Sequence, residues 1–88
     1  MGDRAGLKLL QRARVSTQGW RRVQLDKLYR GFGFVIQGQT KHDIVKHPDY
    51  PDLRATLTRS SNDLHPAYVR HAVAMIEELL RRRQERQE

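Results

Sequence analysis

The chain contains no cysteine, which excludes disulfides and thiolate zinc sites. It also has no run of about 20 apolar residues, so no transmembrane helix is expected. Met1-Gly2-Asp3-Arg4 leads into a charged segment, and no apolar stretch typical of a signal peptide follows. A soluble cytoplasmic protein that has no contact with a membrane is therefore the expectation.

Several familiar catalytic arrangements are missing as well. The sequence has no glycine-rich phosphate loop, no carboxylate pair and no Ser/His/Asp arrangement. None of the pairs among its four histidines has the i, i+4 spacing or another recognised ligand spacing. We therefore expect neither a metal nor a cofactor.

Positive charge is what the chain has in excess. Lys and Arg number 17 against 10 Asp and Glu, which gives a formal net charge of +7 in 88 residues and a sequence pI near 10.6. Such a balance suits a polyanionic partner, because each neutralised phosphate releases counterions. An acidic protein partner, or simple solubility, would account for the same excess.

Apolar periodicity predicts three helices. An amphipathic segment at residues 4–14 is ended by Ser16-Thr17-Gln18-Gly19. A second helix carries Leu25, Leu28, Tyr29 and Phe32, and Gly31 or Gly33 can end it in the left-handed conformation. Pro66 suits the first position of the last helix, whose apolar stripe is Val69, Ala72, Val73, Ile76, Leu79 and Leu80.

Between the second and last helices the pattern predicts three strands, at residues 34–37, 41–47 and 53–58. Gly38-Gln39 and residues 48–52 are the tight connections, and residues 59–65 form a polar loop. The expected fold is α+β: a three-stranded antiparallel sheet with the helices packed on one face.

Length allows one domain over residues 1–88. Its parts are an N-terminal helix and linker at 1–21, a core at 22–80 and a charged helix end at 81–88. The helix–meander–helix part has the α-β-β-β-α architecture of double-stranded-RNA-binding domains (dsRBDs), and residues 4–14 add a helix to it. The arginines at 81–86 are expected to lie on a solvated, fraying helix end; RNA contact there is the alternative.

Four pieces of sequence in one order carry a family resemblance. They are Leu25-Asp26-x-Leu28, Gly33-Phe34, His42-Asp43-Ile44-Val45-Lys46-His47-Pro48 and Pro66-Ala67-Tyr68-Val69-Arg70. In this order and spacing the chain resembles the HicA toxins, small mRNA interferases of type II toxin–antitoxin pairs. The resemblance covers nearly the whole chain, because longer members begin with an extra helix.

The resemblance implies an endoribonuclease that cleaves mRNA without a metal and is inhibited by a HicB-like antitoxin. On the family pattern His42 matches the catalytic histidine. Thr40-Lys41 stands where Gly-Ser is usual, Asp43 follows the histidine, and Ser60-Ser61 lie where a further histidine is common. We expect these departures to affect substrate binding and the catalytic rate, but the general base is retained.

The residue chemistry of the second strand agrees with such a site. An imidazole can take and return a proton near neutral pH, so His42 can draw the proton from a ribose 2′-hydroxyl. In a regular strand His42, Ile44 and Lys46 share one face, and Lys46 lies ~13 Å from His42, near a neighbouring phosphate. Lys41 reaches the scissile phosphate only if the strand begins after it; the sequence leaves this open.

Other side chains are secondary candidates. Tyr50 is the candidate for stacking on a base, ahead of Trp20 and Tyr68, whereas Tyr29 fits the core. Arg54, Thr58 and Arg59 are expected to contact the RNA backbone. Among the remaining histidines, His47 is interpreted as structural, His65 as a helix cap and His71 as a partly buried packing residue.

Two rival functions explain the same charge. A non-catalytic RNA-binding module would use His42 as a phosphate or base contact. An interaction protein would use the basic surface to meet an acidic partner, and its behaviour toward RNA would be insensitive to salt.

Overall fold

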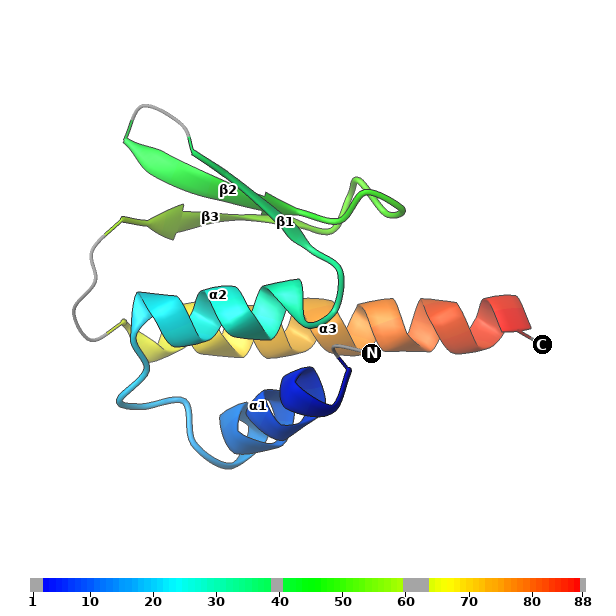
Figure 1. Cartoon of the computed structure of the whole chain (residues 1–88), viewed down its shortest axis with the longest axis horizontal. Coiled ribbons are helices and arrows are strands. Elements are labelled where there is room, and N and C mark those ends of the chain that lie inside the picture. Colours follow the sequence, from blue (N-terminus) through cyan, green and yellow to red (C-terminus); the bar gives the residue numbers. More distant parts are fainter. Residues whose placement is uncertain (1–2, 39–40, 60–63, 88) are drawn as a thin grey trace.

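The structure, a computed structural model, describes residues 3–38, 41–59 and 64–87. Three helices and three strands follow one another as α-α-β-β-β-α (Figure 1). They are α1 (Asp3–Val15), α2 (Arg22–Arg30), β1 (Val35–Gly38), β2 (His42–Lys46), β3 (Arg54–Thr58) and α3 (Pro66–Gln87). The predicted α+β class is confirmed.

The three strands form an antiparallel meander in the order β1-β2-β3, as the sequence predicts. The register places Val35 of β1 opposite Lys46, and in β3 it places Thr58 opposite His42 and Arg54 opposite Lys46. Leu53 was expected to begin the third strand but belongs to the β2–β3 turn. Its N–H donates to the Tyr50 carbonyl at 2.9 Å, and its carbonyl accepts from the His47 N–H at 3.2 Å.

All three helices lie on one side of the sheet (Figure 1). α2 and α3 run side by side beneath it, and α1 packs against both of them on the side away from the sheet. α1 can approach the end of α2 because two glycines meet there. A Cβ added to Gly31 would lie 2.9 Å from the Gly6 Cα, a distance that real side chains do not tolerate.

The core fills the space between these layers. Leu25 and Leu28 of α2, Val45 of β2 and Ile76 of α3 are fully buried. Trp20, a candidate for base stacking in the sequence, is instead part of the core: it is fully buried and its Nε1–H donates to the Ser16 carbonyl at 3.0 Å. Burial of so large an apolar ring outweighs any use of it at the surface.

The α2–β1 connection settles which glycine takes the left-handed conformation. Gly33 has φ +87°, whereas Gly31 remains right-handed with φ −62°. The predicted helix therefore ends at Arg30, before Phe32, although Phe32 is buried as expected. Tyr29 is also buried in the core, as predicted.

The last helix continues through residues 81–86 to Gln87, and Arg82 donates to Asp52 at 2.9 and 2.7 Å, which joins this helix end to the β2–β3 turn. One histidine of the helix differs from expectation. His71 is exposed and not a packing residue, because it lies about 100° round the helix from the buried Ala72. Within the part of the chain described, no helix is long and apolar enough to cross a membrane.

Matched substitutions on α2 test this core. Leu28 is fully buried, whereas Val23 on the same helix is 59% exposed. We expect Leu28→Ala to lower the free energy of unfolding by about 2–5 kcal/mol, through lost apolar burial and the cavity left behind. Val23→Ala should change it by less than about 0.5 kcal/mol. Urea unfolding followed by circular dichroism measures both; equal effects would contradict the described packing.

Candidate functional site

The face of the sheet turned away from the helices is basic. Side chains that alternate along the strands point to this side: His42, Ile44 and Lys46 from β2 are joined by Arg54 and Thr56 from β3. All of these are exposed except Ile44, which is half-buried. The intervening Asp43 and Val45 point toward the helices: Val45 is buried, and Asp43 bonds to Arg22 of α2. The strand is regular from His42 to Lys46, so these residues share one face, as expected for a regular strand. We call this surface the open face.

His42 stands at one end of the open face, as the first residue of β2 and opposite Thr58. Its imidazole is exposed, and no residue within the described ranges hydrogen-bonds to it. The preceding residue, Lys41, is exposed and lies in the bend before the strand. This meets the condition under which Lys41 can reach a phosphate bound at His42.

Lys46 and Arg54 stand at the other end of the open face. They are directly paired across β2 and β3, and both are exposed. Paired residues of neighbouring strands lie about 5 Å apart, so the two cations can meet the same or adjacent phosphates. Four residues of strand separate them from His42, or ~13 Å.

A network of ion pairs lies on the opposite side of the sheet, directly behind His42. Arg22 is 9% exposed, and its guanidinium lies 2.7 Å from Asp26 and 2.6 Å from Asp43. Its third nitrogen donates to the Thr58 carbonyl at 2.7 Å. These contacts tie the start of α2 to β2 and to the end of β3.

The network accounts for Asp43, which departs from the family pattern, and bears on Arg59, a predicted RNA contact. Asp43 is structural: the hydrogen bond from Arg22, and a weaker one from Arg59, hold the pKa of Asp43 below its usual value. Burial lowers the pKa of Arg22, but the hydrogen bonds and charges of Asp26 and Asp43 outweigh it and raise that pKa. Arg59 lies 3.2 Å from Asp43, so the structure does not place it on the open face with His42.

Tyr50 also lies apart from His42. It belongs to the β2–β3 turn, at the end of the sheet that carries Lys46 and Arg54. Its ring contacts the His47 imidazole at 5.6 Å between centroids, and the Arg82 guanidinium lies over the ring at 5.4 Å. The Arg82 guanidinium therefore occupies one face of the ring, and a base that stacks on that face competes with it.

His47 has the structural role expected from the sequence. It is buried, and its Nδ1 accepts the Asp49 N–H at 3.1 Å. The proton consequently sits on Nε2, which donates to the Phe32 carbonyl at 3.2 Å. The predicted cap at His65 is confirmed too, because its Nδ1 accepts the Ala67 N–H at 3.1 Å.

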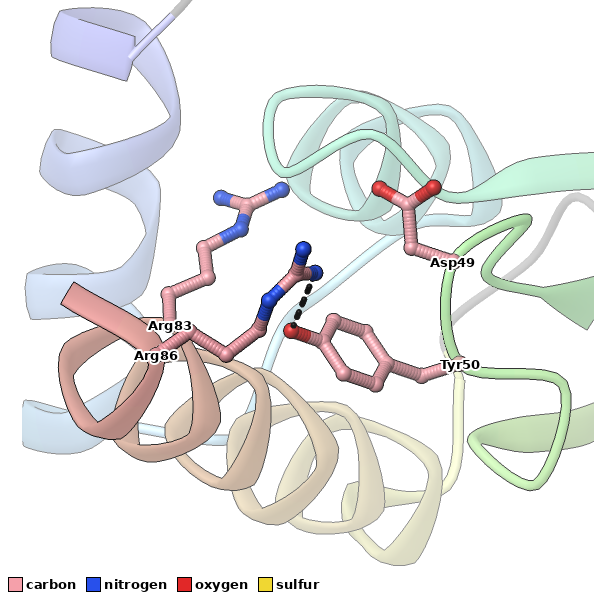
Figure 2. Close-up of a pocket in the computed structure, with 4 residues that line it drawn as sticks. All are labelled: Asp49, Tyr50, Arg83 and Arg86. Atoms are coloured by element: carbon pink, nitrogen blue, oxygen red, sulfur yellow. Dashed lines mark hydrogen bonds between the residues drawn. The ribbon is translucent and has the colours of Figure 1, made fainter.

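The structure groups a second basic feature whose members the sequence did not bring together. Asp49 and Tyr50 of the turn, with Arg83 and Arg86 of α3, line a pocket of about 380 Å³, here called the arginine pocket (Figure 2). The charge run at 81–86 marked these arginines in the sequence. The sequence could not show that this helix end meets the turn, because the Arg82–Asp52 contact joins residues 30 positions apart.

The fold and the open face together define a small α+β domain with a basic sheet surface and an exposed histidine. In comparisons with known proteins, no family model, no curated protein and no solved structure matches the chain. Among the described residues no three histidine or carboxylate side chains gather into a potential metal site. Ser60-Ser61, Thr40 and the Gln39 connection lie outside the described residues.

The ion-pair network makes a pH-dependent prediction. Because the folded-state pKa of Asp43 is lowered, its ion pairs stabilise the fold above the unfolded pKa of about 3.9 and are lost as the pH falls through the folded pKa. Asp43→Asn should therefore lower Tm at pH 7, and the difference from the parent should vanish in strong acid. Thermal unfolding from pH 7 to pH 2 measures this; a difference independent of pH would contradict it.

Proposed function

We propose that this chain is an RNA-cleaving toxin, an mRNA interferase of the HicA type on a dsRBD-like scaffold. The observation that carries the proposal is the exposed imidazole of His42 on a basic sheet face. RNA laid along this face meets Lys41 and His42 at one end and the Lys46–Arg54 pair at the other. The general base and the phosphate contacts then belong to one surface.

The proposed reaction uses the RNA's own 2′-hydroxyl. Neutral His42 takes the 2′-hydroxyl proton, and the oxygen attacks the adjacent phosphorus while the bond to the 5′-oxygen breaks. The 5′-oxygen takes a proton from solvent water and leaves as a hydroxyl, the His42 imidazolium returns its proton to the solvent, and the phosphate is left as a 2′,3′-cyclic diester. The Lys41 ammonium stabilises the negative charge that develops on the phosphoryl oxygens. No metal is needed for this chemistry.

The alternative is a non-catalytic RNA-binding module on the same open face. It is favoured by one observation: within the described part of the chain no residue orients the His42 imidazole, whereas general bases are often held by a third group. Incubation of the protein with labelled mRNA in EDTA separates the two. Fragments support the nuclease, and retarded but intact RNA supports the binding module.

A toxin of this kind works in the cytoplasm on mRNA and needs a partner that blocks it. We propose a HicB-like antitoxin that covers the open face, where the exposed Lys46 and Arg54 would attract an acidic surface. The simplest test of this pairing is to see whether the adjacent reading frame encodes such an antitoxin. If instead the chain only meets an acidic protein, its behaviour toward RNA will not change with salt.

Replacement of the general base tests the reaction. We expect His42→Ala to lower RNA cleavage by about 10²- to 10⁴-fold, the usual contribution of a general base, and to leave the circular dichroism spectrum unchanged. His71→Ala removes an exposed histidine of α3 and should cleave at the parental rate. Cleavage by His42→Ala at the parental rate would place the chemistry elsewhere.

The two lysines of the open face should differ in kinetic effect. Lys46 lies ~13 Å from His42 and contacts a neighbouring phosphate, so Lys46→Gln should raise KM and leave kcat nearly unchanged. Lys41 acts on the developing charge, so Lys41→Gln should lower kcat. Steady-state cleavage of a short labelled RNA measures both constants. The reverse pattern would contradict the assignment.

A further inference from the structure

The arginine pocket plays no part in the proposed reaction and lies away from His42. Its tyrosine and aspartate come from the β2–β3 turn, which begins five residues after His42, or ~16 Å along an extended strand. Figure 2 shows Arg86 reaching from α3 to the Tyr50 hydroxyl, with Arg83 extending beside it from the same helix. The pocket therefore sits at the end of the sheet where Lys46 and Arg54 stand.

The arginines near this end of α3 fall into two kinds. Arg81 bonds to Glu78 and Glu85, and Arg82 bonds to Glu78 and Asp52, so carboxylates neutralise both. Within the described part of the chain, Arg83 and Arg86 have no ion pair. These two arginines, which form no ion pair, are the ones that line the pocket.

The contacts of Arg83 and Arg86 leave most of their donors unused. Arg83 donates to the Phe32 carbonyl at 3.3 Å, and Arg86 donates to the Tyr50 hydroxyl at 3.3 Å. Both distances are at the long end for hydrogen bonds. A guanidinium carries five N–H donors in a planar fork that matches phosphate oxygens, and the Tyr50 hydroxyl has a proton of its own to donate.

Asp49 also lines the pocket, and its carboxylate repels a bound anion. Two arginines and one aspartate leave the lining with a formal charge of +1. The pocket thus favours a ligand that bears a single negative charge and several acceptor oxygens. A phosphodiester has both properties.

From this arrangement we propose that the arginine pocket binds a backbone phosphate of RNA other than the one that is cleaved. It continues the path that the open face begins, past Lys46 and Arg54 to the end of the sheet. The proposal rests on the proposed function only in taking RNA as the ligand. It gives the chain a second anchoring point and makes binding depend on RNA length.

Salt-dependent RNA binding tests the pocket. Binding is measured in EDTA on the His42→Ala background, so that no cleavage is required, with a labelled single-stranded RNA at several salt concentrations. Arg86→Gln removes a pocket arginine, and Arg81→Gln removes a neutralised one from the same helix, so both variants lower the net charge equally. Circular dichroism checks that each variant is folded.

We expect Arg86→Gln to weaken RNA binding several-fold and to reduce the slope of log K against log salt by ~0.7, the loss of one phosphate contact on a single strand. Arg81→Gln should leave the slope unchanged, and Asp49→Asn should tighten binding. Equal slopes for Arg86→Gln and Arg81→Gln would overturn the pocket while leaving the nuclease intact. Conversely, the pocket is retained and the nuclease refuted if Arg86→Gln and Arg81→Gln change the slope as expected but the wild-type chain does not cleave RNA.

Inorganic phosphate serves as the second probe, followed by the NMR signals of the arginine Nε–H groups. Shifts of Arg83 and Arg86 together with the changed RNA slope support an RNA phosphate site. The same shifts without any change of slope overturn the proposal, because the pocket then takes a free phosphate and not RNA.

Discussion

The buried guanidinium of Arg22 is the constraint on which the candidate site depends. A charge removed from water is stable only if it is paired, and here Asp26, Asp43 and the Thr58 carbonyl supply the partners. These bonds hold the first turns of α2 against β2 and β3. Because Asp43 must face Arg22, the strand's alternation turns its neighbour His42 to the opposite side, onto the open face.

The same sheet carries a second anchored end. At the β2–β3 turn, Arg82 bonds to Asp52 and lies over the Tyr50 ring, and the buried His47 bonds to Phe32 and Asp49. These contacts explain why α3 stays helical beyond the core. The protein thus presents exposed basic groups at both ends of β2, supported from beneath by different polar contacts.

Patterns of short period made the fold predictable. Period-two alternation predicted the strands to within one or two residues and placed His42 and Lys46 on one face, and the glycines marked the end of α2. Contacts between distant segments were not predictable. Arg22 with Asp43, Arg82 with Asp52, and the ring contacts of Tyr50 join positions whose sequence spacing carries no signal. Trp20 shows the same limit, since only the packed core reveals that its ring is buried.

The chemical ends of the RNA products test the central claim most directly. If His42 activates the 2′-hydroxyl, mass spectrometry of an RNA incubated with the protein in EDTA will find 2′,3′-cyclic phosphate and 5′-hydroxyl ends. A single 2′-deoxy substitution at the cleaved position will block the reaction. RNA that stays intact, or that is cut to 3′-hydroxyl and 5′-phosphate ends, would contradict the account.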